Sequence, residues 1–431
     1  MELIVNKDNA SSNIERVHVS EITYEDFYEN YMKRNIPLIL TGYIDKHWTS
    51  YKSFCNNNSN NNNIGHTSNM NMEINIEYLI NKFRDAKVPV YEHSSIDIES
   101  RVYGNATNIT MTFQEYIENY YYYDKNTTAV TKASLSSLTS KKKEERANIN
   151  NSLFYLKDWH YNIACMEANV DSEYSIPVYF QSDWLNEWWE MHRREFFFNF
   201  ENPKHQQYIK YIYNVENDID KESDFKFLYF GNANTFTPLH HDIFKSYSWS
   251  GQIVGQKKWY LYPPHNEKYF DDDPPCGNYK LLSSEKHKLK YGPKLKYVTG
   301  MIEVVQEPGE LIFVPSGWYH EVYNQTSSIS INHNWLNECN IEMVYQHLKE
   351  EWKQTVNAII DIKDIMAEKK DFILECNKLM HRNTGMSLYE FRFFILFYIE
   401  KYKKNVSSSI AALELLTKIV ADVNLELIDI V

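Results

Sequence analysis

The chain has 431 residues, enough for one large domain with additional elements or for two domains. Its formal net charge is −13, which excludes the basic surplus typical of general nucleic-acid-binding proteins but allows a basic protein partner. No apolar run approaches the roughly 20 residues that a membrane-spanning helix needs, and the N-terminus lacks the features of a secretory signal. We therefore expect a globular protein that contacts neither nucleic acid nor membrane directly.

Residues 1–150 are predicted to flank a catalytic domain, and they contain two low-complexity segments. Residues 55–72 form an Asn-rich tract, and residues 123–151 are rich in Ser, Thr and Lys. Neither segment has enough hydrophobic residues to offset the entropy of ordering, so we expect loops or disorder there. Ahead of both, NIPLILTGYIDKHW predicts an apolar strand followed by a turn.

Residues 151–340 contain a succession of short segments typical of strands. They are rich in aromatic and β-branched residues and are bounded by Gly, Pro, Asn or Ser. They are LFYLKDWHY, IPVYFQSDW, FKFLYFG, SYSWSGQIVG, KKWYLYPP, GELIFVP, YHEVYN and SISINHNW. Many short strands with tight turns predict a mainly β fold, a double-stranded β-helix or jelly roll with flanking helices.

Residues 341–431 change character and are predicted to form a helical C-terminal subdomain. The segment from Cys339 onward has apolar residues at helical spacing. Ser387 and Glu390 have the spacing of a capping box ahead of FRFFILFYI, and the tail is again amphipathic. The five cysteines are far apart, odd in number and without a CxxC pair, which favours free thiols in a reducing compartment.

The motif that points to chemistry is Thr237-Pro-Leu-His-His-Asp242. Residues two apart on a strand point to the same side, so His240 and Asp242 can reach one metal ion. His320, after a Gly turn in FVPSGWYHEVYN, can supply a third ligand from a returning strand. Two histidines and one carboxylate on one face of an octahedron are the ligand set of non-haem Fe(II) oxygenases.

Taken alone, this motif is weak evidence, because short HxD patterns are common. An ordinary hydrogen-bonded strand histidine is the more frequent interpretation of His240, and equally of His320. His241 is an alternative ligand, but it would face the opposite side of a regular strand from Asp242.

The longer pattern resembles a known family. The stretch TPLHHDIFKSYSWSGQIVGQKKWYLYPP, followed by GELIFVPSGWYHEVYNQTSSISINHNW, is similar to JmjC-domain oxygenases, in the hydroxylase-type branch that includes lysyl hydroxylases. Similarity is densest over residues 153–337. It is greatest to the subgroup that acts on the eukaryotic translation release factor. The resemblance implies the cupin type of jelly roll, with Fe(II) as the cofactor, 2-oxoglutarate and O2 as co-substrates, and His240, Asp242 and His320 as the iron ligands.

The same resemblance implies which residues bind 2-oxoglutarate. Lys257 matches the lysine that holds its distal carboxylate, and a strand would place Lys257 on the inner face with Lys258 turned outward. Thr237 and Tyr155 match residues that hydrogen-bond the co-substrate. Ser250 and Asn332 stand where relatives carry an asparagine and a threonine, so both positions remain polar.

We therefore expect a protein hydroxylase that modifies a lysyl side chain of a translation termination factor and converts 2-oxoglutarate to succinate. The resemblance also implies a cytoplasmic location, although the nucleus stays open, and pairing of two copies through C-terminal helices. Two alternatives remain at this point. One is demethylation of N-methyl-lysine, and the other is a non-catalytic cupin that binds a partner.

Overall fold

The computed structural model describes residues 13–56, 73–94, 107–121, 152–198, 203–213, 224–269, 298–404 and 409–428. The predictions for the segment 123–151 and for nearly all of 55–72 lie outside these residues. The chain divides into two compact units that interleave along the sequence, whereas the sequence suggested three consecutive segments. The first unit comprises Met1–Tyr179, Lys226–Asp242 and Ser248–His333, and the second comprises Phe180–Phe225, Ile243–Tyr247 and Asn334–Val431.

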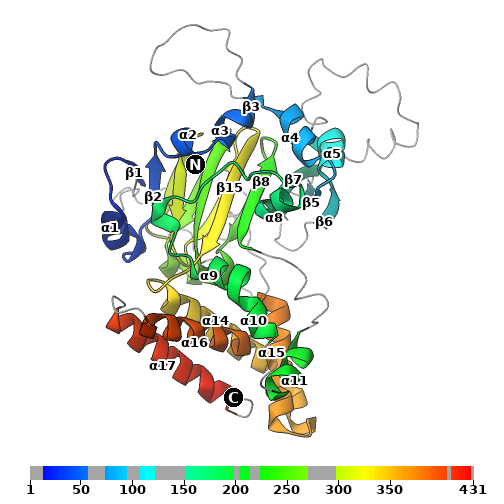
Figure 1. Cartoon of the computed structure of the whole chain (residues 1–431), viewed down its shortest axis with the longest axis vertical. Coiled ribbons are helices and arrows are strands. Elements are labelled where there is room, and N and C mark those ends of the chain that lie inside the picture. Colours follow the sequence, from blue (N-terminus) through cyan, green and yellow to red (C-terminus); the bar gives the residue numbers. More distant parts are fainter. Residues whose placement is uncertain are drawn as a thin grey trace, which may run out of the picture. The chain divides into compact units, whose positions relative to one another are not determined.

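A nine-stranded sheet forms most of the first unit (Figure 1). The strands, in spatial order, are β1 (Glu15–His18), β2 (Leu38–Thr41), β13 (Leu311–Val314), β10 (Tyr247–Val254), β15 (Ser328–Trp335), β8 (Lys226–Gly231), β7 (Ser152–His160), β5 (Lys87–Ser94) and β6 (Thr107–Thr112). The strands β1 and β2 at one edge are parallel. The pairs β2–β13, β13–β10, β15–β8, β8–β7, β7–β5 and β5–β6 are antiparallel.

A second, four-stranded sheet completes the jelly roll. Its strands, all antiparallel, are β12 (Ile302–Gln306), β11 (Lys257–Tyr262), β14 (Tyr319–Asn324) and β9 (Phe236–His240). One apolar cluster joins the two sheets, because Ile312 and Val314 of β13 pack with Trp259 and Leu261 of β11. The predicted jelly-roll fold is therefore confirmed.

Strand β15 shows how the polar interior arises. Ser328, Ser330 and Asn332 alternate with Ile329 and Ile331 along it, and the serines and isoleucines are all buried. Alternation places the two sets on opposite faces of the sheet. One face therefore carries the hydrophobic contacts, and the other brings hydroxyl and amide groups to the interior of the jelly roll.

The first unit also contains short helices around the sheets. After β2 the chain bends at Gly42 and Tyr43, where a turn was predicted, and α2 (Ile44–His47) follows. The other helices of this unit are α1 (Tyr24–Phe27), η1 (Tyr28–Met32), α3 (Ser50–Ser53), α4 (Ile76–Phe83), α5 (Phe113–Tyr116), η2 (Ile117–Tyr121), α8 (Tyr161–Glu167) and η7 (Pro264–Tyr269).

The prediction of a strand at IPVYFQSDW is wrong. This segment forms a 3-10 turn, η4 (Val178–Phe180), followed by α9 (Trp184–Glu187). The physical reason is a helix cap, since the Asp183 side chain accepts a hydrogen bond from the backbone N–H of Asn186. Of the aromatic and branched residues that suggested a strand, Tyr179, Phe180 and Trp184 are buried, whereas Val178 is exposed.

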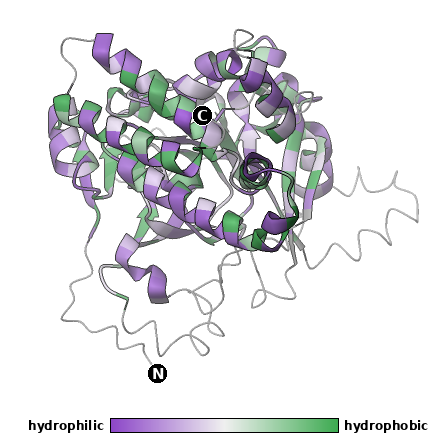
Figure 2. Ribbon diagram, turned by 90° about the horizontal axis from the view of Figure 1, so that it is seen from below, coloured by the Kyte–Doolittle hydropathy of each residue, from purple (hydrophilic) through white to green (hydrophobic). Residues whose placement is uncertain are grey.

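Helices make up the second unit, and in Figure 2 polar and apolar residues alternate along them. Ser387 caps α16 (Leu388–Lys404) as predicted, but the Glu390 carboxylate accepts a hydrogen bond from Arg193 instead of returning to the cap. Among the described residues, no helix is long and apolar enough to cross a membrane. The remaining helices are η5 (Trp188–His192), α10 (Arg193–Phe197), α11 (Pro203–Ile212), η6 (Ile243–Lys245), α14 (Ile341–Ala358), η8 (Ile360–Ile365), α15 (Lys369–Thr384) and α17 (Ile410–Glu426).

Candidate active site

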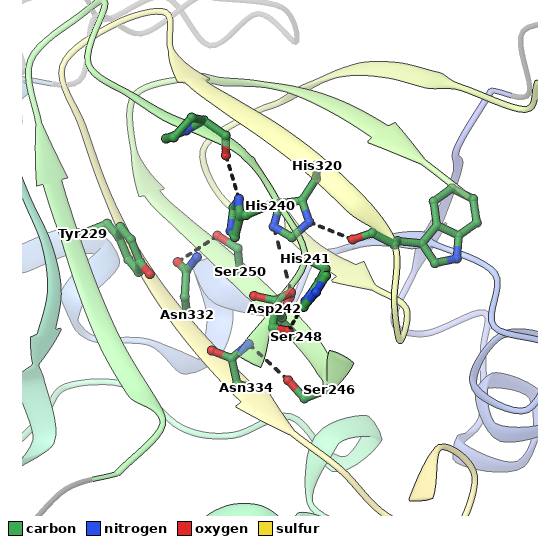
Figure 3. A network of polar contacts seen from close by, with 12 residues as sticks. Tyr229, His240, His241, Asp242, Ser246, Ser248, Ser250, His320, Asn332 and Asn334 are labelled. Carbon is green, nitrogen blue, oxygen red and sulfur yellow. Dashed lines mark hydrogen bonds and ion pairs between the residues drawn. The ribbon is translucent and has the colours of Figure 1, made fainter. Parts of the chain in front are cut away.

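Two histidines from neighbouring strands face each other inside the jelly roll (Figure 3). His240 is the last residue of β9, and His320 is the second residue of β14. The antiparallel register places them directly opposite one another, and their ring centroids are 4.2 Å apart. Residues 80 positions apart in the sequence are thus brought together by strand pairing alone.

Both imidazole rings are oriented for metal binding. The Nδ1 atom of His240 lies 2.8 Å from the carbonyl oxygen of Pro238, and Nδ1 of His320 lies 3.1 Å from that of Trp318. A carbonyl oxygen can only accept, so each Nδ1 carries the proton and the lone pair of each ring is on Nε2. Backbone carbonyls commonly fix metal-binding histidines in this way.

Asp242 completes the set just beyond β9. Its Oδ2 atom lies 3.9 Å from Nε2 of His320 and accepts a hydrogen bond of 2.7 Å from the Ser248 hydroxyl. The candidate ligand atoms of His240, Asp242 and His320 all lie within 4.8 Å of one another. In the part of the chain that the structure describes, this is the one group of three or more such side chains so arranged.

His241 lies outside this group. Its Nδ1 atom is 2.8 Å from the backbone carbonyl oxygen of Asp242, and its ring packs edge-on against Tyr319 with centroids 5.1 Å apart. The structure thus separates two adjacent histidines that the motif alone left as alternatives.

The electrostatics of the group suit a divalent cation. Burial and the neighbouring His320 lower the pKa of His240 to about 3, so its imidazole is neutral at physiological pH. Metal binding requires neutral imidazole and ionised carboxylate. Two such nitrogens and one carboxylate oxygen form the donor set that iron(II) takes in facial triads, so the residues present fit this metal.

Lys257 supplies a buried cation beside the group. It is only 1% exposed, and its Nζ donates a hydrogen bond of 2.5 Å to the Ser330 hydroxyl. Among the described residues no carboxylate forms an ion pair with it, and burial lowers its pKa to about 7. A buried ammonium group without an anion fits the distal carboxylate of 2-oxoglutarate. Lys258 points away, as predicted, and pairs with Glu303.

A hydrogen-bonded chain connects Lys257 to two of the predicted co-substrate residues. Ser330, which accepts from Lys257, donates to Oδ1 of Asn332 at 2.9 Å, and Ser250 donates to the same oxygen at 3.0 Å. Ser250 and Asn332 thus lie together at the interior (Figure 3). Ser330 was not predicted, although its place two residues before Asn332 on β15 puts it on the same face.

Tyr155 and Thr237 also lie within the interior of the first unit. Tyr155 is 2% exposed, and burial raises the pKa of its hydroxyl while a hydrogen bond with Asn324 counteracts the rise. Thr237 is 8% exposed and lies opposite Val322. Its hydroxyl forms no hydrogen bond with any residue that the structure describes, so it is available to a ligand.

Sequence reasoning missed three further residues at the interior face of the nine-stranded sheet. They are Tyr229 of β8 and Lys157 and Asp158 of β7. The Tyr229 ring lies 5.2 Å from Nζ of Lys257 and 6.1 Å from the Tyr155 ring, and the charge of Lys157 acts on His240. The alternation of residues along β8 could have indicated that Tyr229 faces the interior. The positions of Lys157 and Asp158 depend on an irregularity in the pairing of β7 with β8, which no sequence pattern indicates.

Comparison with known proteins points to the same chemistry. The family model described as "Cupin-like domain" matches residues 24–341. The mouse (Mus musculus) protein "2-oxoglutarate and iron-dependent oxygenase JMJD4" is 31% identical over 382 residues, which cover 88% of this chain and 73% of that protein. "Arginine-specific demethylase JMJ20" of Arabidopsis thaliana is 31% identical over 386 residues, covering 89% and 69%. "Bifunctional arginine demethylase and lysyl-hydroxylase psr-1" of Caenorhabditis elegans is 22% identical over 360 residues, covering 80% and 65%.

Proposed function

Because this chain belongs to the cupin-like JmjC family of 2-oxoglutarate- and iron-dependent oxygenases, we propose that it is a protein hydroxylase that acts on a lysyl side chain. The observation that carries the proposal is the pairing of the metal-binding group with the buried, anion-free Lys257. The lysyl specificity rests on the resemblance around SYSWSGQIVG and SISINHNW and on the name of the nematode relative. The substrate we propose is a translation release factor.

The chain's own residues would divide the work as follows. His240, Asp242 and His320 would hold iron(II) through two imidazole nitrogens and one carboxylate oxygen. Lys257 would neutralise the distal carboxylate of 2-oxoglutarate, while Thr237 and Tyr155 orient the co-substrate. Iron with 2-oxoglutarate and O2 supplies the oxidising chemistry, in which one oxygen atom enters a C–H bond and the other enters succinate as CO2 leaves.

Mass spectrometry of release-factor peptides tests the proposal. The wild-type protein with Fe(II), 2-oxoglutarate and O2 should add 16 Da to a lysine and form one succinate per hydroxylation. The Asp242→Ala variant should do neither. A 16 Da gain on another residue type, with lysine unmodified, would exclude the lysyl assignment.

Demethylation is the second candidate, because the plant relative is named an arginine-specific demethylase and the nematode relative is named for both activities. The same site would hydroxylate an N-methyl carbon, and the product would then release formaldehyde. Methylated histone peptides provide the test. Loss of 14 Da together with formaldehyde would favour this alternative over lysyl hydroxylation.

We also propose a cytoplasmic location and pairing of two copies through the C-terminal helices, both of which rest on the family resemblance. Mass photometry of the full chain at nanomolar concentration distinguishes a monomer of 51.4 kDa from a dimer.

A further inference from the structure

Strand β7 contains a bulge on the face that lines the active site. Leu156 pairs with Phe230 and Trp159 pairs with Leu228, so two residues of β7, Lys157 and Asp158, oppose the single residue Tyr229. Such bulges often occur beside active sites, where they redirect a side chain. Here the bulge places a cation and an anion together at the interior face of the nine-stranded sheet.

Tyr229 connects Asp158 to the co-substrate site. Its hydroxyl donates a hydrogen bond of 2.6 Å to Oδ1 of Asp158, while its ring lies 5.2 Å from Nζ of Lys257. Tyr229 lies on the same sheet face as Asn332 and points toward the interior (Figure 3). The Asp158 carboxylate is thus one hydrogen bond away from the wall of the 2-oxoglutarate site.

The Asp158 carboxylate retains the capacity to bind another donor. Its Oδ2 atom lies 3.7 Å from Nζ of Lys157, which is beyond hydrogen-bonding distance, and its side chain is 32% exposed. The Lys157 side chain is only 3% exposed and lies over the Tyr91 ring at 4.3 Å. A carboxylate offers about four acceptor positions, and the Tyr229 hydroxyl occupies one of them.

The charge of Lys157 favours an anion beside a cationic substrate. Lys157 places a buried ammonium group at the interior, where it would repel a lysyl side chain, whereas the charge of Lys257 would be neutralised by 2-oxoglutarate. Desolvating an unpaired ammonium group would add to that cost. A carboxylate that is partly exposed and oriented by Tyr229 would offset both effects.

We propose that Asp158 determines specificity by receiving the cationic end of the substrate side chain whose carbon chain is to be hydroxylated. This inference rests on the proposed lysyl hydroxylation. Asp158 would bind the ammonium group, and Tyr229 would hold the carboxylate in position without itself contacting the reacting carbon.

The test compares release-factor peptides that contain lysine with the same peptides carrying norleucine, which has the same carbon chain without the charge. The wild type should favour lysine in kcat/KM by about tenfold or more, the range expected for a charged hydrogen bond. In Asp158→Asn, which keeps an oxygen for Tyr229, most of this preference should disappear through a higher KM for lysine. The matched control is Glu303→Gln, because Glu303 of β12 is a carboxylate that pairs with Lys258 outside the site. This variant should retain the preference for lysine.

The possible outcomes separate the two proposals. The Fe(II)–2-oxoglutarate absorption band should be unchanged in Asp158→Asn, which verifies folding and co-substrate binding independently of turnover. An unchanged lysine preference in that variant would overturn the role of Asp158 and leave lysyl hydroxylation standing. Equal use of lysine and norleucine by the wild type would also overturn it, without relying on any variant. Hydroxylation of a different residue type would overturn both.

Discussion

His240 and His320 occupy directly opposed positions on β9 and β14, with their ring centroids 4.2 Å apart. Side chains alternate along a strand, so a shift of the pairing by one residue would turn one of the two rings to the other face. The register between these strands therefore determines whether a metal-binding group exists at all.

Replacement of these adjacent histidines is expected to have opposite results. His240→Ala should abolish the weak visible absorption band that Fe(II) and 2-oxoglutarate give under anaerobic conditions, because one of three protein ligands is removed. His241→Ala should retain the band, since the side chain lies outside the metal-binding group. Anaerobic titration of both variants and the wild type provides the measurement. Retention of the band in His240→Ala would exclude this residue as a ligand.

Much of the site was predictable because it follows regular strand geometry. Alternation in KKWYLY placed Lys257, Trp259 and Leu261 on the buried face, as observed, whereas Asp242 joins His240 although it lies beyond the end of β9. The return of His320 beside His240 required only that the strand after the Gly turn pair with β9. Patterns with a period of two thus predicted the side chains that depend on that period.

The remaining features depend on contacts that no local pattern encodes. The interior position of Asp158 results from a bulge whose effect depends on the partner strand. The hydrogen bonds that connect Lys257, Ser330 and Asn332 depend on how the two sheets pack against each other. The segment before Trp184 has strand-like composition, but the Asp183 cap starts a helix there. In each case a tertiary or capping interaction outweighed composition.

Lys257→Met is expected to stabilise the protein and impair its function. Without 2-oxoglutarate, the variant should unfold at a higher temperature, because a buried ammonium group without an ion-pair partner carries a desolvation cost that a hydrophobic side chain does not. Its binding free energy for 2-oxoglutarate should weaken by at least about 2 kcal/mol, which raises the Kd roughly 30-fold, since the distal carboxylate loses its cation.

Lys258→Met is the control for this experiment, because Lys258 belongs to the same strand but is ion-paired with Glu303 outside the site. Calorimetric titration of the Mn(II)-loaded protein should give nearly the wild-type Kd for this control. Equal affinities in Lys257→Met and wild type would show that the carboxylate binds elsewhere.

Gly231→Ala should displace Tyr155. A Cβ atom at Gly231 would lie 2.4 Å from Oγ1 of Thr235 and 2.6 Å from Cδ2 of Tyr155, and both neighbours are buried. Overpacking of this kind costs about 1–3 kcal/mol in the free energy of unfolding, and movement of Tyr155 should also weaken 2-oxoglutarate binding.

Gly385→Ala separates these two effects. Gly385 has a positive φ of 83° but no atom within 4 Å of an added Cβ, so this variant should lose stability without a change in 2-oxoglutarate affinity. Chemical denaturation and calorimetric titration of both variants test the comparison. Wild-type affinity in Gly231→Ala would mean that Tyr155 does not orient the co-substrate.

The affinity for 2-oxoglutarate should fall as the pH rises above neutrality. Burial lowers the pKa of Lys257 to about 7, so in the free protein the ammonium group is present below this pH and is lost above it. Binding of the distal carboxylate favours the protonated form, and above pH 7 it must therefore be accompanied by proton uptake. The Kd should approach a tenfold increase per pH unit between about pH 7 and the higher pKa of the complex, and be nearly constant below pH 7.

The folding stability of the protein without 2-oxoglutarate should instead increase as the pH rises above neutrality. The unfolded chain holds this proton up to its ordinary pKa near 10.5, so the Lys257 contribution makes the folded state more stable as pH rises above 7. Calorimetric titrations at several pH values, with Lys257→Arg as a variant that stays charged throughout, provide the measurement. The same pH dependence in that variant would assign the effect to another group.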